Sequence, residues 1–278
     1  MMHGMTNTTP PYTNLYHVIN ALQLRLTTSV YGFDTGIVTL AERLAERLKV
    51  RYETPAERLL YENGRVIGIR LKSGEMIKAD YVIVATPIGC AAELMPDELK
   101  FAREFLSSFP HTPLPLVFFF LDRPLKADSY AFFGHPLRDT IYNVALNHTR
   151  KTPYMVKSGR AIISAWPCYP GAMQMIGESD GVIIRQALDD LDAFFPGIAN
   201  WVAEARVMRH TWGVARYEIG THRKILDFKR AAAQVKGLFF VGNDYDGVHM
   251  ECGIRGARRA ANSAMAEAIG SVAANGTI

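Results

Sequence analysis

Cysteines are few in this sequence, and long apolar runs are missing. The three cysteines, Cys90, Cys168 and Cys252, are too few and too far apart for a disulfide framework or a cysteine-based zinc site. We therefore expect a protein of a reducing compartment, the cytoplasm, that holds no metal. No stretch approaches the ~20 consecutive apolar residues that a membrane-spanning helix needs, so the sequence lends membrane association no support.

The signatures of several other protein classes are also absent. The 31 Lys and Arg nearly balance the 27 Asp and Glu and form no block, so only the net charge of +4 favours nucleic-acid binding, and we expect none. There is no Gly-x-Ser-x-Gly of a hydrolase and no His-x-x-x-His metal pair. With 49% hydrophobic and 21% charged residues, the 278-residue chain has the composition of a globular protein of one large or two small domains.

A strand-rich stretch follows the amino-terminal region. Asn63-Gly64 separates two apolar runs, residues 56–61 and 66–71. Both residues of an Asn-Gly pair accept the positive φ angles of a tight turn, so a hairpin is predicted, with a third strand at 76–78. Residues 81–85 are continuously apolar, which predicts a strand buried on both faces of a parallel sheet.

Helices are predicted at residues 15–26, 35–49 and 182–194. The second has apolar residues every three or four positions, as a buried helix face requires. Residues 98–230 are rich in aromatic side chains and alternate short strands with loops. Within them, the apolar run 114–121 predicts a buried strand.

The carboxy-terminal part begins with an apolar strand at 237–244 that ends in a glycine turn. A loop through Gly247 leads into a helix over residues 253–269. Small side chains leave the inner face of this helix nearly bare, so it can pack close to a sheet or a ligand. These small residues are Ala257, Ala260, Ala261, Ala264 and Ala268.

Three segments together resemble the FAD-dependent amine oxidase superfamily, which includes protoporphyrinogen oxidases and phytoene desaturases. They are residues 79–87, 211–222 and 237–261, whose order and spacing are those of the later part of such flavoproteins. The resemblance extends from about Gly32 to Ile269. It implies an α/β fold in which a partial, Rossmann-like FAD-binding domain is joined to a substrate domain with a mixed sheet, and it implies non-covalent FAD. In such a fold, residues 81–85 and 238–241 are expected to lie in one buried parallel sheet.

The same resemblance implies domain boundaries. Residues 35–96 and 231–278 would form the partial FAD-binding domain, and residues 97–230 the substrate-binding domain. Residues 1–34 would add a helix to the substrate domain.

The most specific part of the resemblance lies in residues 237–261. In the family, a strand ends in a glycine and a polar residue, a glycine loop follows, and a tripeptide opens a helix. Helix N-termini stabilise anions, so the N–H groups near the tripeptide are implied to face the negatively charged end of reduced flavin, while the glycines let the backbone approach the ribityl and pyrophosphate groups. By themselves these residues also suit an ordinary strand–loop–helix unit. The matching positions are Gly242, Asn243, Asp244, Gly247, Met250, Glu251 and Cys252.

Two residues depart from the family pattern. Cys252 stands where the family has glycine, and it is either a small buried side chain or a thiol near the flavin. His249 stands where amine oxidases often have a tyrosine of an aromatic cage, which argues against amine-oxidase substrate chemistry in particular. It is a candidate acid or base, or a group that orients the substrate, with a structural histidine as the alternative.

The other two segments imply further contacts. Trp212 and Tyr217 have the aromatic spacing of a stretch that lies beside the flavin ring in the family, and they are candidate catalytic residues, with two ordinary core aromatics as the alternative. An adenine contact is implied for the backbone at Ala56. The turn Ala85-Thr86-Pro87 is implied to lie near the cofactor.

One element of these flavoproteins is not found in the sequence. They bind ADP through an amino-terminal Gly-x-Gly-x-x-Gly loop, whereas no two glycines here are two positions apart. The chain therefore resembles the carboxy-terminal portion, either truncated or completed by a second polypeptide that carries the loop. We expect such a complementary subunit, or self-association, and a small organic substrate.

Two functions follow from these observations. The first is a subunit of an oxidoreductase in which the flavin takes a hydride equivalent from a C–H or C–N bond. The second is a non-catalytic binding or scaffolding subunit that retains the flavoprotein fold.

Overall fold

The computed structural model describes residues 13–16, 18–19, 22–23, 32–134, 140–247 and 249–275, with side chains described to residue 269. They fall into two compact units. Unit 1 comprises residues 1–50 and 111–219, and unit 2 comprises residues 51–110 and 220–278. The helix predicted at 15–26 lies partly outside the described residues, and its described positions are helical.

Unit 2 contains an antiparallel meander of three strands. These are β1 (Ala56–Glu62), β2 (Arg65–Leu71) and β3 (Met76–Lys78). Asn63 and Gly64 have φ angles of 49° and 81°, so the predicted hairpin is confirmed, together with the backbone conformation that was its physical reason.

A parallel pair of strands forms the second sheet of unit 2. β4 (Val82–Val84) pairs with β10 (Leu238–Phe240), which confirms that these distant segments share one parallel sheet. The expected burial of β4 on both faces is wrong, because Ile83 is 45% exposed. The described part of this sheet consists of these two strands, and Ile83 lies on the face of β4 opposite to that of the buried Val84.

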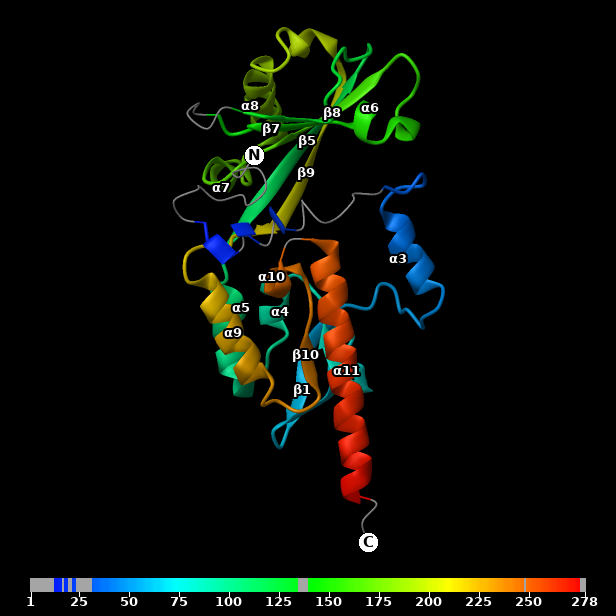
Figure 1. Ribbon diagram of the computed structural model, residues 1–278, viewed down its shortest axis with the longest axis vertical. Helices are drawn as coiled ribbons and strands as arrows, with labels where there is room; N and C mark the ends of the chain where they lie inside the picture. Colours follow the sequence, from blue (N-terminus) through cyan, green and yellow to red (C-terminus); the bar gives the residue numbers. More distant parts are fainter. Residues whose placement is uncertain are drawn as a thin grey trace. The chain divides into compact units, whose positions relative to one another are not determined.

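The described residues of unit 2 also form five α-helices and a 3-10 turn at Asp97–Leu99. The helices are α4 (Ile88–Glu93), α5 (Lys100–Ser108), α9 (Thr221–Ala232), α10 (Asn243–Asp246) and α11 (Met250–Asn275). α5 and α9 lie side by side (Figure 1), where the rings of Phe105 and Phe228 stack with centroids 4.2 Å apart. This packing places residues 97–110 and 220–230 in unit 2, whereas the boundaries expected from the sequence put them in the substrate domain.

Only part of the predicted alanine face of α11 is covered. Ala260 is buried, and Ala264 and Ala268 are half-buried. The covered positions of α11 recur every four residues from Cys252 and so lie along one side of the helix. Ala257 and Ala261 lie on another side and are exposed.

The sheet of unit 1 has five strands. Their spatial order is β6 (Ala131–Phe133), β7 (Val144–Asn147), β8 (Ala161–Trp166), β5 (His111–Leu121) and β9 (Val202–Ala215). All its pairings are antiparallel over the described residues, so the mixed sheet predicted for this part of the chain is wrong in that detail. Alternating apolar residues reveal a strand but not the direction of its neighbour. β5 and β9 have 11 and 14 residues and are longer than the short strands predicted.

One face of this sheet is covered by α8 (Asp180–Asp192), which confirms the helix predicted at 182–194. Ile183, Ala187 and Leu191 of α8 are buried in one cluster with Val117 and Phe119 of β5, which confirms the predicted buried strand. Figure 1 shows α8 against this sheet. The remaining helices are short: α6 (His148–Lys151), α7 (Gly171–Met175) and three-residue or four-residue 3-10 turns at Pro153–Met155 and Ile198–Trp201.

The helix predicted at 35–49 is shorter than expected. α3 (Val38–Ala45) is amphipathic but has no buried residue. Its predicted core face is therefore wrong for the described residues, where Ile37, Leu44 and Leu48 are exposed. Spacing predicts an apolar face but cannot show whether another element packs on it.

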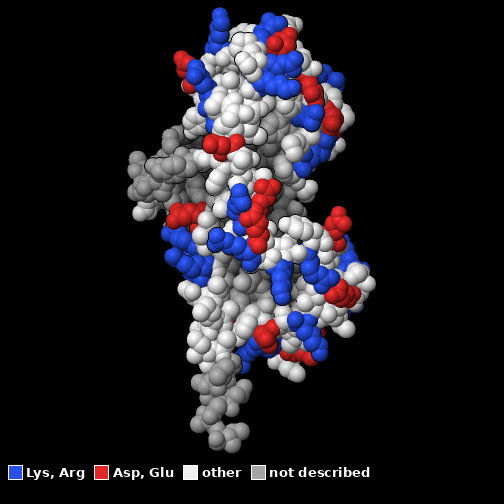
Figure 2. Space-filling view, turned by 90° about the vertical axis from the view of Figure 1, so that its right-hand side faces the viewer, with Lys and Arg blue, Asp and Glu red and all other residues white. Residues whose placement is uncertain are grey.

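Among the described residues, no helix is both long enough and apolar enough to cross a bilayer. On the face shown in Figure 2, the Lys and Arg side chains are interspersed with Asp and Glu.

Candidate functional site

The turns that follow β4 and β10 meet in unit 2. The two strands are parallel neighbours, so the segments that follow them leave the sheet at the same end. The backbone N–H of Ile88, the first residue of α4, donates a hydrogen bond of 3.0 Å to Oδ2 of Asp244 in α10. Six of the predicted cofactor residues are thus brought together: Ala85, Thr86, Pro87, Gly242, Asn243 and Asp244.

The other predicted residues of this segment surround the start of α11. The φ of Gly247 is 125°, in the region that favours glycine. His249 precedes the helix, and its carbonyl oxygen accepts the Cys252 N–H at 3.0 Å. Its ring Nε2 is buried without a hydrogen-bond partner among the residues that the structure describes. Met250 and Glu251 are exposed, and Cys252 is buried.

Three predicted site residues lie elsewhere. Ala56 begins β1 and pairs with Leu71 in the meander, not in the parallel sheet. Trp212 lies on β9 of unit 1, where its ring meets the His111 ring edge-on at 5.3 Å between centroids. Tyr217 follows β9 and is buried. Contacts of these residues with a flavin stay predictions.

The short helix α10 interlocks with α11. If Gly253 carried a Cβ, that atom would lie 3.0 Å from Oδ1 of Asn243. A Cβ on Gly256 would lie 2.7 Å from Oδ2 of Asp246, closer than real contacts allow. Two side-chain oxygens of α10 therefore rest against α11 at two glycines spaced almost one turn apart.

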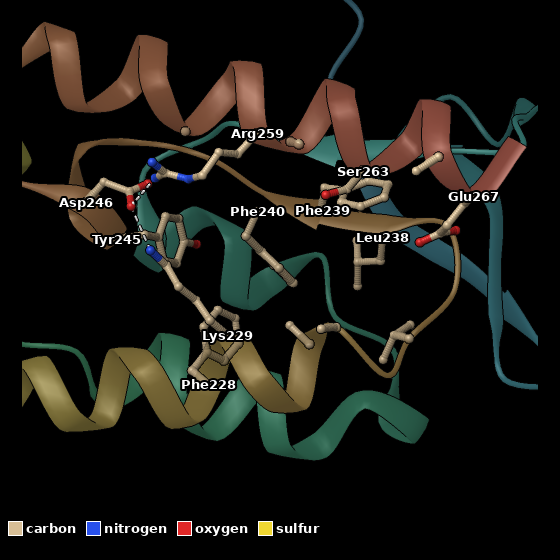
Figure 3. Close-up of a pocket in the computed structure, with 16 residues that line it drawn as sticks. Phe228, Lys229, Leu238, Phe239, Phe240, Tyr245, Asp246, Arg259, Ser263 and Glu267 are labelled. Carbon is tan, nitrogen blue, oxygen red and sulfur yellow. Dashed lines mark hydrogen bonds and ion pairs between the residues drawn. The ribbon is translucent and has the colours of Figure 1, made fainter. Parts of the chain in front are cut away.

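Asp246 also joins two helices through its charge. Oδ1 accepts from Nζ of Lys229 in α9 at 2.7 Å and from Nη2 of Arg259 in α11 at 2.5 Å. Figure 3 shows the carboxylate between the two cations. The Asp246 side chain is 13% exposed, whereas the Lys229 and Arg259 side chains are 38% and 60% exposed, so the carboxylate is covered while both cations reach the solvent.

An aromatic cluster holds α10 from the side of the sheet. Tyr245 is 3% exposed and its ring lies 5.9 Å from Phe228 and 6.0 Å from Phe240, measured between centroids. Burial raises the pKa of the Tyr245 hydroxyl above its usual range, so the side chain is neutral at any physiological pH. Every residue of α10 is thus engaged by a neighbouring element.

A cavity of about 610 Å³ lies between α9, β10 and α11. Its wall is largely apolar, with Leu238 and Phe240 from β10, while the Asp246 triad lines one part and Glu267 another. Oε2 of Glu267 accepts the Gly237 N–H at 3.4 Å. The cavity is separate from the residues predicted to contact a cofactor.

Sequence reasoning did not identify the residues that hold this site together. Asp246, Lys229, Arg259 and Ile88 have no motif of their own. One signal was present, because Gly253 and Gly256 at the start of an alanine-rich helix mark a close approach of another element.

A protein-family match identifies the chain. Residues 6–265 match the family described as flavin containing amine oxidoreductase. The chain belongs to this family. The match confirms the family suggested by the three sequence segments, and the cofactor of this family is FAD.

Individual relatives agree with this family. The coproporphyrinogen III oxidase of Bacillus subtilis is 24% identical over 221 residues, which are 77% of this chain and 46% of that protein. A provisionally assigned protoporphyrinogen oxidase from Exiguobacterium sp. 255-15 has the same fold, with a TM-score of 0.71 and 22% identity over 90% of this chain and 58% of that one. Putrescine oxidase bound to putrescine has a TM-score of 0.67 and 16% identity over 84% and 53%. The chain spans about half the length of these proteins.

The residues of unit 2 fit a flavin. The first turn of the 26-residue helix α11 offers the N–H groups of Met250 and Glu251, for which the described residues provide no intrahelical acceptor, beside the buried, unpartnered Nε2 of His249. Gly242 and Gly247 have φ angles of 149° and 125° and carry no side chain, so a cofactor can come close to the backbone at these two positions. This donor set suits the electron-rich end of an isoalloxazine.

Proposed function

We propose that this chain is part of an FAD-dependent oxidoreductase that takes a hydride equivalent from a small organic substrate. The main support for the proposal is that the turns after β4 and β10 meet near the start of α11. This contact brings together residues of two motifs that are 156 positions apart in the sequence. FAD, bound non-covalently, supplies the electron acceptor. We place the protein in the cytoplasm, since all three cysteines are free.

The chain's own residues have distinct roles in this proposal. The N–H groups at the start of α11 stabilise negative charge on the reduced cofactor. His249 holds or moves a proton at Nε2, which has no competing partner among the described residues. Trp212 and Tyr217 contribute aromatic surface next to the reacting ring.

The substrate class that we propose is a porphyrinogen, an apolar tetrapyrrole macrocycle that carries carboxylate side groups and becomes flat on oxidation to a porphyrin. The names of two relatives suggest this class. In unit 1, Phe118 and Phe120 alternate with core residues of β5 and therefore lie on the sheet face opposite α8. The guanidinium of Arg206 lies 5.6 Å from the centre of the Phe120 ring; its Nε pairs with Oε1 of Glu204, and the side chain is 68% exposed, so its other N–H groups are accessible to a ligand. Aromatic surface beside a cation suits an apolar ring that carries carboxylates.

We further propose that a complementary polypeptide carrying the Gly-x-Gly-x-x-Gly loop supplies the ADP-binding half. Apolar surface of unit 2 supports this proposal. Ile83 on β4 is 45% exposed, and Ile254, Met265 and Ile269 on α11 are 60%, 63% and 69% exposed. A sheet edge next to exposed apolar side chains favours association.

The test uses the full chain, alone and co-expressed with the part of the Bacillus subtilis relative that the chain does not match. We expect bound FAD, detected by its visible absorbance, only in the co-expressed sample. That sample should convert coproporphyrinogen III or protoporphyrinogen IX to a fluorescent porphyrin and leave putrescine unchanged. Tight FAD binding by the chain alone would overturn the complementary-subunit proposal. A co-purified but colourless complex would instead favour the scaffolding function.

A further inference from the structure

The contacts that hold α11 in place converge on one carboxylate outside the predicted cofactor residues. Oδ1 of Asp246 bonds Lys229 of α9 and Arg259 of α11, at 2.7 and 2.5 Å. Its other oxygen, Oδ2, lies against the backbone of α11 at Gly256. Asp246 therefore contacts α11 twice, through the charge of Arg259 and through the surface of Gly256.

The geometry of this contact needs both partners. A Cβ at position 256 would stand 2.7 Å from Oδ2, so any other residue at this position would push the carboxylate away. Arg259 lies three residues further along the same helix face, where its guanidinium reaches Oδ1. Gly256 and Arg259 together therefore form a position on the surface of α11 that accommodates one carboxylate.

Asp246 sits between the two ends of the candidate flavin site. It is the last residue of α10, directly before Gly247, and α10 follows the turn at Gly242. Its contacts with α11 lie within the first turns of that helix, close behind His249 and Cys252. A shift of Asp246 would therefore change how the start of α11 is held relative to the end of β10.

We propose that Asp246 is a positioning residue for the flavin site, which acts by fixing the first turns of α11 and so the direction of their N–H groups. This inference rests on the proposed function. Asp246 does not touch the cofactor itself; it acts through α11. The ion pair with Lys229 holds the Asp246 carboxylate against α9 and so fixes which side of α11 the carboxylate contacts.

Two variants remove the contact in different ways. Asp246→Asn removes the charge that holds Lys229 and Arg259 but keeps the size of the side chain. Gly256→Ala keeps every charge and displaces Oδ2 sterically. Asp227→Asn is the matched control, because Asp227 pairs with Arg230 at 3.1 Å on the exposed surface of α9.

The first measurement is hydrogen exchange of the full chain without flavin. Local opening sets these rates, so we expect amide exchange at Cys252 and Gly253, whose N–H groups donate to the His249 carbonyl oxygen, to rise about 10-fold in Asp246→Asn and Gly256→Ala. Exchange in the β1–β2 hairpin should stay unchanged in both, and the control should match the wild type throughout. Unchanged exchange at Cys252 and Gly253, or an equal rise in the hairpin, would overturn the inference.

The second measurement is the reduction potential of the flavin-loaded protein. Loss of a negative charge near the flavin would by itself favour the reduced, anionic form and raise the potential. Loss of the helix N–H groups would disfavour that form and lower the potential. If Asp246 positions α11, the reduction potential should be lower than that of the wild type in both variants. A raised potential in Asp246→Asn together with an unchanged potential in Gly256→Ala would contradict a positioning role. Absence of flavin from the wild-type complex would overturn the proposed function instead, so the two failures are distinguishable.

Discussion

The carboxylate of Asp244, just after β10, caps helix α4, which follows the neighbouring parallel strand β4. Its Oδ2 accepts the Ile88 N–H at 3.0 Å, although the two residues are 156 positions apart. The residue at the usual capping position is Pro87, whose side chain makes no capping hydrogen bond. The first N–H groups of a helix need a partner from outside the helix, and here the turn after the neighbouring strand provides it.

Substitution of Asp244 by alanine should destabilise the protein by about 1–2 kcal/mol, because the Ile88 N–H loses its acceptor. Urea denaturation followed by circular dichroism measures this free energy of unfolding. Asp244→Asn is the control, since its amide oxygen can still accept the hydrogen bond, and it should be closer to the wild type. Equal stability of wild type and Asp244→Ala would contradict the capping role.

Gly247→Val should abolish FAD binding in the assembled enzyme. The φ of 125° at this position excludes a β-branched residue without strain, and a side chain would fill space that the cofactor needs. Gly74→Val is a matched control, since Gly74 has a φ of 88° in the meander with no atom near its missing Cβ. The control should lose stability but keep FAD. Flavin absorbance of the purified complexes distinguishes the two, and full occupancy in Gly247→Val would count against the loop's role.

Alanine substitutions at Gly64 and Gly68, two glycines of the meander, should lower the free energy of unfolding by different amounts. Gly64 has a φ of 81° and open space around it, so Gly64→Ala should cost only the backbone strain, about 1 kcal/mol. A Cβ on Gly68 would lie 2.1 Å from the carbonyl oxygen of Ile77, so the β2–β3 ladder would have to move. We expect Gly68→Ala to cost more than about 3 kcal/mol. Thermal unfolding of both variants measures the difference, and similar melting temperatures would show that the meander is more adaptable than its geometry indicates.

His148 should make the stability of the protein depend on pH. Burial, assisted by the charge of Lys151, lowers the pKa of His148 from 6.5 to about 4. Its Nε2 lies 2.9 Å from Oγ of Ser164, which also accepts the Nε1–H of Trp166. Between pH 6.5 and 4 the unfolded chain binds a proton that the folded chain does not, so the free energy of unfolding falls as the pH falls through this window.

We expect this loss to be at most about 2 kcal/mol, because solvent screens a partly exposed ring. His148→Gln keeps a polar partner for Ser164 but does not titrate. Urea midpoints at pH 7 and pH 5 should therefore differ less in this variant than in the wild type. The same pH dependence in both proteins would rule out His148 as its source.

The exposed apolar residues of α11 should mediate association. Ile254→Lys and Met265→Lys place charges on the surface proposed to be covered, and we expect both to weaken co-purification with the complementary polypeptide. Ile219→Lys is the control, because Ile219 is exposed in unit 1. Size-exclusion chromatography with light scattering measures the mass of the species present. Assembly of the two α11 variants at wild-type strength would place the interface elsewhere.

Local interactions explain what could be predicted from the sequence. The turn at Asn63-Gly64 depends on two adjacent residues that accept positive φ angles, and the helix at 182–194 depends on a repeat of apolar residues. The parallel pairing of β4 with β10 is a long-range feature, and it was predicted only because the two segments resemble a known family. The exposure of Ile83 and Leu44 was not predicted, since apolar periodicity is the same whether or not a neighbour covers it.

The tertiary structure alone decided how the candidate site is held. Sequence patterns located Gly242, Gly247 and His249, because glycine turns and a helix start leave a local record. No local pattern joins Asp246 to Lys229 and Arg259, because a single carboxylate can pair with many cations along the chain and only the packing of α9, α10 and α11 selects two of them. The sequence thus determined which residues surround the start of α11, and the fold determined which contacts keep it in place.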